Sequence, residues 1–214
     1  MPICGIKSNR IPIAVTMPAS IMPYFNQMFT SVKSIIHLFI FFLTPLMVFA
    51  QELDSDFSDY VPFVTTPDEV VMAMLKLAEI SEKDILYDLG SGDGRIPIAA
   101  ALHFGARSTG VEIDPDLVLI SKKKAIDLGV MDKVTFIQGD LFDLDFSEAT
   151  VLVIYLFPDI NIKLKPKILK MKPGTKVVSH RFDMGDWIPE KTEKVVLKDG
   201  KEHVIYLWIV PEKE

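Results

Sequence analysis

The feature that most constrains the fold of this chain is a glycine-rich turn that lies between a short apolar segment and a helical pattern. Residues 84–89 (DILYDL) predict a buried strand, and residues 95–103 predict a helix. Residues 90–94 between them read GSGDG. Glycines at such a turn let backbone N–H groups approach a ligand closely, because no Cβ atom intervenes. The turn is therefore the first candidate for a ligand-binding site.

The C-terminal part of the chain repeats this alternation of short apolar runs and helical patterns. Further strands are expected at residues 108–113, 134–138, 150–155, 176–179, 193–197 and 203–210. Further helices are expected at residues 67–80, 116–128 and 160–171. The alternation predicts an α/β fold with a mostly parallel, seven-stranded sheet and helices on both faces. Asp199 and Gly200 mark a hairpin turn, so the sheet is expected to end in an antiparallel pair.

The first of the expected helices has a clear start signal. Thr66 is expected to be its N-cap, with Pro67 at the first helical position. Glu69 follows the cap by three residues, which completes the pattern of a capping box. We therefore expect Thr66 and Glu69 to bond to the backbone at the start of this helix.

The spacing of the glycines differs from that of a dinucleotide-binding turn. The dinucleotide fingerprint is G-x-G-x-x-G, whereas Gly94 comes one position too early for it. Asp88 before the turn and Asp93 within it would repel a pyrophosphate but suit a ligand that carries positive charge. The turn thus disfavours a nicotinamide-dependent oxidoreductase and favours a ligand such as a sulfonium with an α-amino group.

Two further acids follow the next two expected strands. Glu112 lies at the end of the second strand, and Asp140 follows the third. Ligands of open parallel sheets bind beyond the carboxyl ends of the strands. Asp88, Glu112 and Asp140 are therefore expected to converge on one site. An aspartate in this position also serves simply as a turn or cap residue, and that alternative stays open for Asp140.

Together these residues resemble a known family. Residues 88–94 (DLGSGDG), 110–114 (GVEID) and 139–141 (GDL) resemble successive cofactor motifs of class I S-adenosylmethionine-dependent methyltransferases. The resemblance covers about residues 61–211 and implies a Rossmann-like fold with S-adenosyl-L-methionine as the cofactor. Residues 61–67 (VPFVTTP) are similar to protein-lysine methyltransferases that modify mitochondrial inner-membrane proteins, and to their bacterial relatives.

The resemblance also implies roles for individual residues. It places Asp88 and Gly90 near the amino group of the cofactor, Glu112 at its ribose, and Asp140 with Leu141 at its adenine. The full set of expected cofactor-binding residues is Asp88, Gly90, Ser91, Gly92, Gly94, Glu112, Asp140 and Leu141.

The same resemblance places a lid and an acceptor pocket near the cofactor. Residues 63–66 would form the lid, and residues 155–159 (YLFPD) would border the acceptor at the end of the fourth strand. This segment departs from the Asn-Pro-Pro-Tyr motif of enzymes that methylate amides and bases, which disfavours a nucleobase or a glutamine as the acceptor; the resemblance to protein-lysine methyltransferases implies a protein lysine. Tyr155 either orients the amine or simply packs. His180 either takes a proton from the lysine ammonium or is a strand-end histidine bonded to backbone.

No catalytic residue is assigned from the sequence, because in-line methyl transfer mainly requires alignment and desolvation of the nucleophile. Two other functions fit the same motifs. One is a protein that binds the cofactor or a partner without catalysis, and the other is a small-molecule methyltransferase. The sequence does not distinguish these alternatives and does not indicate an oligomeric state.

Composition excludes several other classes of function. The formal net charge is -6, and the sequence contains no run of five or more basic residues, so a nucleic-acid partner is not expected. Cys4 is the single cysteine, which excludes an internal disulfide and a cysteine-based zinc site. His103, His180 and His203 fall on separate expected elements without ligand spacing, so no metal site is expected.

The N-terminal segment differs in composition from the rest of the chain. Residues 1–50 contain no acidic residue, and residues 35–50 form an uncharged apolar run that is shorter than a typical bilayer span. Lys33 before this run and Ala50 at its end fit a signal peptide that starts at Met28 and is cleaved after Ala50. An uncleaved membrane anchor and an organellar presequence fit the same features.

This difference predicts how the chain is organised. We expect a leader at residues 1–50, an acidic linker at residues 51–60 and the methyltransferase domain at residues 61–214. The leader predicts a protein that is exported or anchored in a membrane through residues 35–50. The side of the membrane stays open, because the cofactor is made inside cells.

Overall fold

The structure, a computed structural model, describes residues 63–212, which belong to one compact unit of the chain. The expected leader, its cleavage site, the start at Met28 and the acidic linker lie outside the described residues. Within residues 63–212, no helix combines the length and the apolar character that a membrane crossing requires.

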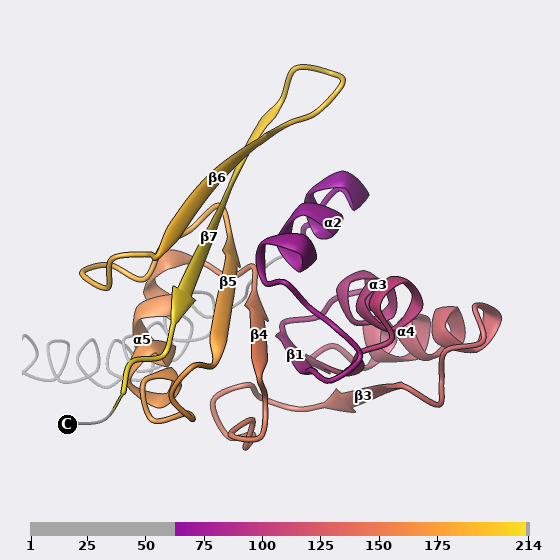
Figure 1. The fold of residues 1–214 in the computed structure, drawn as a ribbon. Helices are drawn as coiled ribbons and strands as arrows, with labels where there is room; N and C mark the ends of the chain where they lie inside the picture. The colour runs from indigo at the N-terminus through magenta and orange to yellow at the C-terminus, as the bar shows by residue number, and fades with distance from the viewer. Residues whose placement is uncertain (1–62, 213–214) are drawn as a thin grey trace, which may run out of the picture. The chain divides into compact units, whose positions relative to one another are not determined.

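Seven strands form a single mixed sheet in the order β3-β2-β1-β4-β5-β7-β6 (Figure 1). The strands are β1 (Ile85–Leu89), β2 (Arg107–Glu112), β3 (Val134–Gln138), β4 (Val151–Ile154), β5 (Lys176–His180), β6 (Lys191–Val196) and β7 (Glu202–Ile209). The helices of the described part are α2 (Asp68–Leu77), α3 (Arg95–Phe104), α4 (Pro115–Asp127) and α5 (Pro158–Ile168).

The directions of the strands confirm the expected α/β architecture. Strands β1 to β5 pair in parallel, and β7 is antiparallel to both β5 and β6. Gly200 has φ +83° in the turn between β6 and β7, a conformation that glycine adopts without steric cost. The sheet is therefore mostly parallel and finishes in the expected antiparallel hairpin.

The sheet is covered on both faces, and β4 shows how its side chains divide. Val151 and Val153 belong to the apolar cluster that includes α2 and α3, whereas Leu152 and Ile154 belong to the cluster that includes α5. All four side chains are fully buried, as expected for a central strand with alternate residues on opposite faces. Figure 1 accordingly shows α5 apart from α2 and α3.

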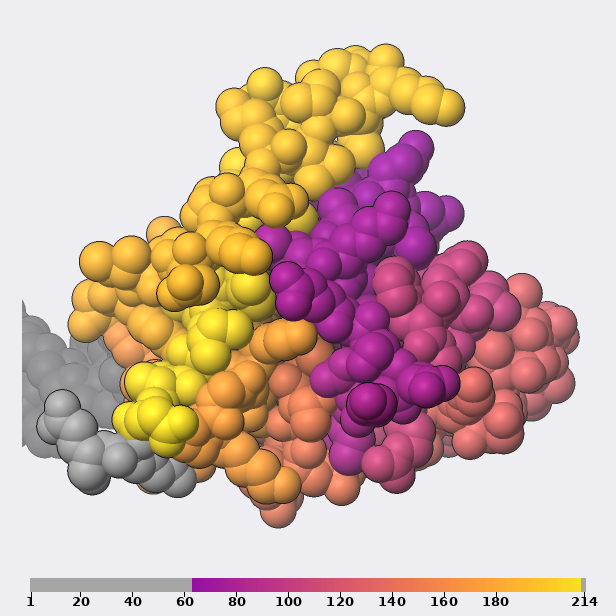
Figure 2. Space-filling view, in the orientation of Figure 1, coloured from indigo at the N-terminus to yellow at the C-terminus, as the bar shows by residue number. Residues whose placement is uncertain are grey.

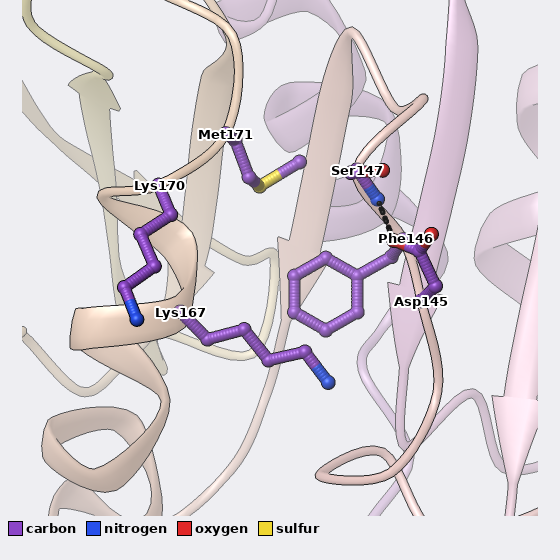
Figure 3. A pocket seen from close by; sticks show the side chains of 6 residues that line it. All are labelled: Asp145, Phe146, Ser147, Lys167, Lys170 and Met171. Carbon is purple, nitrogen blue, oxygen red and sulfur yellow. Dashed lines mark hydrogen bonds between the residues drawn. The ribbon is translucent and has the colours of Figure 1, made fainter. Parts of the chain in front are cut away.

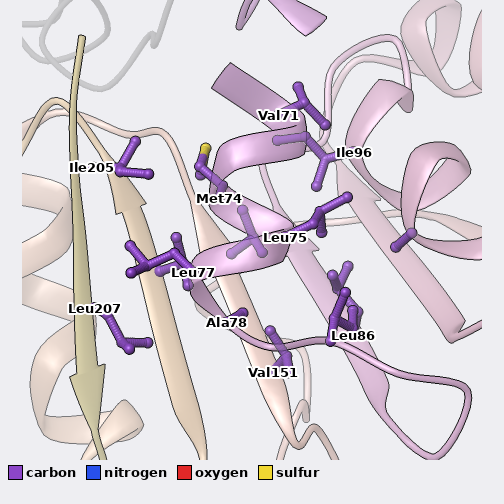
Figure 4. Packing of buried hydrophobic residues seen from close by; sticks show 14 of the residues in the cluster. Val71, Met74, Leu75, Leu77, Ala78, Leu86, Ile96, Val151, Ile205 and Leu207 are labelled. Carbon is purple, nitrogen blue, oxygen red and sulfur yellow. The ribbon is translucent and has the colours of Figure 1, made fainter. Parts of the chain in front are cut away.

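Helix α2 packs on the sheet through the apolar stripe that its sequence predicts. Met74 and Leu75 are fully buried against the cluster that contains Ile205 and Leu207 of β7 (Figure 4). This packing fixes the position of α2. The residues directly before α2 are thereby held near the carboxyl ends of the strands, where the candidate site lies.

The expected capping box at the start of α2 is wrong. The N-cap position is occupied by Pro67, and no side chain there bonds to the backbone of the helix. The Oγ1 atom of Thr66 instead lies 3.2 Å from Nδ1 of His180 on β5. The hydroxyl group that the local pattern assigned to the start of the helix therefore pairs with His180 instead.

Candidate functional site

The glycine turn connects β1 to α3 and is held by the neighbouring strand. Gly90, Gly92 and Gly94 have φ values of +78°, +53° and +76°, which residues with a Cβ atom rarely adopt. The backbone N–H groups of Gly90 and Ser91 both donate to the carbonyl oxygen of Val111 in β2, at 2.9 Å each. The turn is therefore held against β2 at the carboxyl edge of the sheet.

Space around the loop gives its glycines different roles. A Cβ atom on Gly94 would lie 2.5 Å from Cβ of Ser121 and 2.7 Å from the ring of Phe136, so this glycine allows α3 to pack closely. A Cβ atom on Gly92 would lie 2.3 Å from the ring of Phe63. The segment that was expected to form a lid therefore lies directly over the glycine loop.

Asp88 is a buried carboxylate without a protein partner for one of its oxygens. The residue is 2% exposed, and Oδ2 accepts no hydrogen bond in the described part of the chain. Burial, together with the nearby charges of Glu112 and Asp93, raises the pKa of Asp88 to about 8. A cation at this position would remove the cost of the buried charge, because opposite charges favour the ionised form.

Glu112 holds the loop in place. Its Oε2 atom accepts a hydrogen bond from the backbone N–H of Gly92 at 2.8 Å. Its Oε1 atom accepts from the N–H groups of Ile113 and Asp114 at 2.8 and 3.0 Å. Glu112 thus joins the end of β2 to the loop, a role that the spacing of the sequence did not indicate. Its expected place at the ribose stays a prediction.

Asp93 is already paired within the protein. Arg95 donates to both of its carboxylate oxygens at 2.9 and 2.8 Å, and Nζ of Lys124 lies 2.6 Å from Oδ2. Burial alone would raise the pKa of Asp93, but the hydrogen bonds from Arg95 and Lys124 outweigh it and lower the pKa to about 2. The expectation that Asp93 attracts a positively charged ligand is therefore wrong, because its charge is matched by two protein cations.

Asp140 lies directly after β3, at the same edge of the sheet as the glycine loop. It is exposed, and its Oδ1 atom accepts a hydrogen bond from the N–H of Phe142 at 2.8 Å, which makes it a turn residue. Leu141 is partly buried and packs against the apolar cluster beneath α5. The expected contact of Asp140 with adenine stays a prediction.

The loop residues fit a ligand with an ammonium group and further polar atoms. The Oγ atom of Ser91 is buried and, like Oδ2 of Asp88, has no hydrogen-bond partner in the described residues. Buried polar groups are normally satisfied, so two unpartnered ones beside a glycine loop indicate a polar ligand. The amino acid moiety of S-adenosylmethionine has this chemistry. All eight residues expected at the cofactor lie on β1, β2, β3 or the loops that follow them.

Beside the glycine loop, the carboxyl ends of β4 and β5 carry a cluster of aromatic rings, here called the aromatic wall: Tyr155, Phe157, His180 and Phe182. The ring centroids of Tyr155 and His180 are 4.1 Å apart, and that of Phe182 lies 6.3 Å from Tyr155 and 6.1 Å from Phe157. Phe157 is 40% exposed. Because β4 pairs directly with β1, this wall adjoins the loop that follows β1.

His180 takes neither of the two roles expected for it. It is 1% exposed, and its ring nitrogens contact side chains rather than backbone: Nδ1 lies 3.2 Å from Oγ1 of Thr66, and Nε2 lies 2.8 Å from Nδ1 of His203. Burial, together with His203 and Arg181, lowers the pKa of His180 to about 4. The histidine is thus neutral at physiological pH and too weak a base to deprotonate a lysine ammonium.

Two polar residues that sequence reasoning missed fix the position of Phe182. Nδ2 of Asn161 donates to the carbonyl oxygens of Phe182 and Asp183 at 3.4 and 3.1 Å, and the hydroxyl of Ser179 donates to that of Phe182 at 2.5 Å. The sequence contains one indication of the role of Asn161. It falls on the buried stripe of α5, with Leu164, where a polar residue needs a specific partner.

A pocket lies away from the glycine loop, between the residues before β4 and the end of α5. It is lined by Asp145, Phe146, Ser147, Lys167, Lys170 and Met171 (Figure 3). Nζ of Lys167 lies 4.7 Å from the ring centre of Phe146 and donates to the carbonyl oxygens of Phe142 and Leu144, each at 2.6 Å. Lys167 therefore fastens the loop before β4. Residues 63–212 contain no group of three or more side chains arranged to hold a metal ion.

Comparison with known proteins identifies the family of this chain. The profile of the ANTKMT methyltransferase domain matches residues 88–191. A protein-lysine N-methyltransferase of Saccharolobus islandicus is 42% identical over 156 residues, which cover 72% of this chain and 96% of that protein. A relative from Xenopus laevis, named as a lysine N-methyltransferase of an ATP synthase subunit, is 36% identical over 132 residues, which cover 61% of this chain and 56% of that relative.

A solved structure agrees with the fold and the family. A crystal structure described as an RNA methyltransferase from Salinibacter ruber in complex with S-adenosyl-L-homocysteine has 53% sequence identity and a TM-score of 0.66. The match covers 71% of this chain and 96% of that one. The glycine loop, the Rossmann-like sheet and these relatives agree: the chain belongs to the protein-lysine N-methyltransferase family of class I S-adenosylmethionine-dependent methyltransferases.

Proposed function

We propose that this enzyme methylates the side-chain amine of a lysine in a protein. The observation that carries the proposal is the aromatic wall next to the glycine loop. Aromatic faces attract cations, so Tyr155, Phe157 and Phe182 suit an alkyl ammonium and its methylated products. The names of the Saccharolobus and Xenopus relatives support the same acceptor.

The residues of the site have separate roles in such a transfer. When bound, S-adenosylmethionine supplies a methyl group on a sulfonium, which a neutral amine accepts by in-line displacement. Asp88 holds the cationic amino acid end of the cofactor, and Glu112 keeps the glycine loop in its binding conformation. Phe157 and Phe182 exclude water from the acceptor amine, since transfer requires a desolvated and aligned nucleophile. The proton of the lysine ammonium leaves to solvent, because His180 is too weak a base.

RNA is the second candidate for the acceptor, because the Salinibacter structure is described as an RNA methyltransferase. The charge of this chain argues against it. The formal net charge is -6, and RNA binding normally relies on clustered lysine and arginine side chains. A protein acceptor therefore agrees better with the electrostatics of the molecule.

One labelling experiment separates the two acceptors. The full chain is incubated with S-adenosylmethionine carrying a radioactive methyl group, together with protein and RNA fractions of the source cells. We expect label that protease removes and ribonuclease does not, and that acid hydrolysis releases as methylated lysine. Label that ribonuclease removes would overturn the proposal. Asp88→Asn serves as the inactive control, and Asp145→Asn, an exposed acid far from the site, as the matched active one.

We also propose that the enzyme works at a membrane, with residues 35–50 as its attachment. The uncharged apolar composition of this run supports the proposal. Alkaline carbonate extraction of cells that produce the full chain tests it. Retention in the membrane pellet is expected, and release into the supernatant would contradict it. Protease treatment of intact cells then reports the side on which residues 61–214 lie.

A further inference from the structure

Thr66 lies at the junction between the lid and helix α2. It is 3% exposed, whereas the three residues before it, 63–65, are exposed. In Figure 2 the indigo atoms, which belong to the N-terminal end of the described chain together with α2, lie at the surface beside α3. A buried threonine at the base of an exposed segment is in a position to fix that segment in place.

The hydroxyl of Thr66 connects to the acceptor side of the site. Its Oγ1 atom lies 3.2 Å from Nδ1 of His180, whose Nε2 lies 2.8 Å from Nδ1 of His203 on β7. The ring of His180 packs against Tyr155 with centroids 4.1 Å apart. The hydroxyl therefore takes part in setting the orientation of a ring in the aromatic wall.

The carbonyl group of Thr66 connects to the cofactor side. It accepts a hydrogen bond from Nη1 of Arg95 at 2.9 Å. The Nε and Nη2 atoms of the same guanidinium donate to the carboxylate of Asp93 in the glycine loop. The ring of Phe63 lies over Gly92 of the same loop. The two polar groups of Thr66 thus reach the two halves of the site separately.

We propose that Thr66 is a positioning residue that aligns the lid with both halves of the site. Its hydroxyl orients His180 and, through it, Tyr155 of the aromatic wall. Its carbonyl keeps the lid on the glycine loop. The hydroxyl is free for this role because it does not cap α2. The acceptor part of the proposal rests on the proposed methyl transfer to lysine, whereas the cofactor part does not.

The two connections are tested separately on the full chain. Thr66→Val has nearly the same shape but lacks the hydroxyl, and Thr66→Ser retains it. We expect Thr66→Val to lower kcat by about tenfold, the size of effect of one lost buried hydrogen bond, with affinity for S-adenosylhomocysteine within about twofold of the original. Thr66→Ser restores kcat. Arg95→Lys keeps the charge but cannot bond to Thr66 and to both oxygens of Asp93 at once. For this variant we expect weaker binding of S-adenosylhomocysteine and a kcat close to that of the original chain.

The kcat values support or overturn the hydroxyl connection, and unchanged cofactor binding in Arg95→Lys would overturn the carbonyl connection. Equal kcat in Thr66→Val and the original chain would overturn it, as would a Thr66→Ser variant as impaired as Thr66→Val. If no lysine acceptor is methylated by the original chain, the proposed function fails instead, and nitrogen-15 NMR of the histidine rings still tests the hydroxyl connection. We then expect altered His180 resonances in Thr66→Val and unchanged ones in Thr66→Ser. Unaltered resonances in both variants would contradict the hydroxyl connection.

Discussion

The backbone N–H of Gly92 donates a hydrogen bond to Oε2 of Glu112 at 2.8 Å, so the carboxylate at the end of β2 fixes the loop that follows β1. Glu112 is buried and also accepts two further backbone N–H bonds. Three donors converge on this one side chain. The cofactor loop therefore takes its shape from a carboxylate on the adjacent strand as well as from its glycines.

Replacing Glu112 by glutamine should disturb the loop with little change in size. The amide group brings a donor where the carboxylate had only acceptors, so at least one backbone N–H loses its partner. We expect a loss of about 1–3 kcal/mol in the free energy of unfolding and weaker binding of S-adenosylhomocysteine. Urea unfolding and calorimetry measure the two effects. Glu69→Gln, an exposed change on α2, should alter neither, and equal results for the two variants would contradict the role of Glu112.

Ionisation of Asp88 should destabilise the ligand-free protein as the pH rises. Its pKa is about 8 in the folded protein against an ordinary value of 3.8, so ionisation is unfavourable in the folded state. The contribution of Asp88 to stability is fully present below pH 3.8 and is lost as the pH rises to about 8. Asp88→Asn removes this dependence. We expect the variant to gain stability relative to the original chain between pH 5 and pH 8 in thermal unfolding without cofactor; a constant difference would contradict the account.

Gly94 should tolerate no side chain, because both its conformation and its surroundings exclude one. Gly94→Ala places a Cβ atom 2.5 Å from that of Ser121 at a φ of +76°. We expect a loss of about 2–4 kcal/mol in the free energy of unfolding, from overpacking plus backbone strain. Gly129→Ala is the matched control, since Gly129 has φ +68° with no atom within 4 Å of the added Cβ. Its expected cost is about 1–2 kcal/mol, the strain alone. Equal losses would show that packing at Gly94 has no effect.

Asp93 should stabilise the loop by pairing with Arg95 and Lys124. Its pKa is lowered to about 2, so the stability that it supplies is present above pH 3.8 and is lost as the pH falls towards 2. Asp93→Asn leaves two cations without their partner, and we expect it to cost about 1–3 kcal/mol at pH 7. Urea unfolding at pH 7 and at pH 2.5 measures the difference between variant and original, which should shrink at the lower pH. A difference that grows on acidification would contradict the pairing.

Local sequence patterns were sufficient to predict most of the fold. The run at residues 134–138 alternates buried and less buried positions and forms β3 with those bounds. Gly90, Gly92 and Gly94 indicated a tight turn, because glycine adopts positive φ values without steric cost. All three have positive φ values in the structure. Apolar runs and glycine turns depend on neighbouring residues, so the sequence reports them directly.

Partners that come from distant parts of the chain could not be predicted in this way. Thr66 has the local signature of an N-cap, yet its hydroxyl pairs with His180, which lies 114 residues later. Asp93 and Lys124 are 31 residues apart and meet only once α3 and α4 have packed. The expected role of Thr66 was wrong for this reason, since a long-range pairing that satisfies a buried polar group outweighs a weak local preference. For Asp93 the distant Lys124 adds to Arg95, a partner only two residues away in the sequence.

Calorimetric titration with S-adenosylmethionine and, separately, with NAD, on the full chain and on Asp88→Asn, tests whether the glycine loop binds the methyl donor. We expect micromolar binding of S-adenosylmethionine and no binding of NAD to the full chain. Asp88→Asn should lose the binding of S-adenosylmethionine, because its uncharged amide cannot balance the ammonium group. Equally tight binding by Asp88→Asn, or binding of NAD in place of S-adenosylmethionine, would contradict the assignment of the glycine loop as the methyl-donor site.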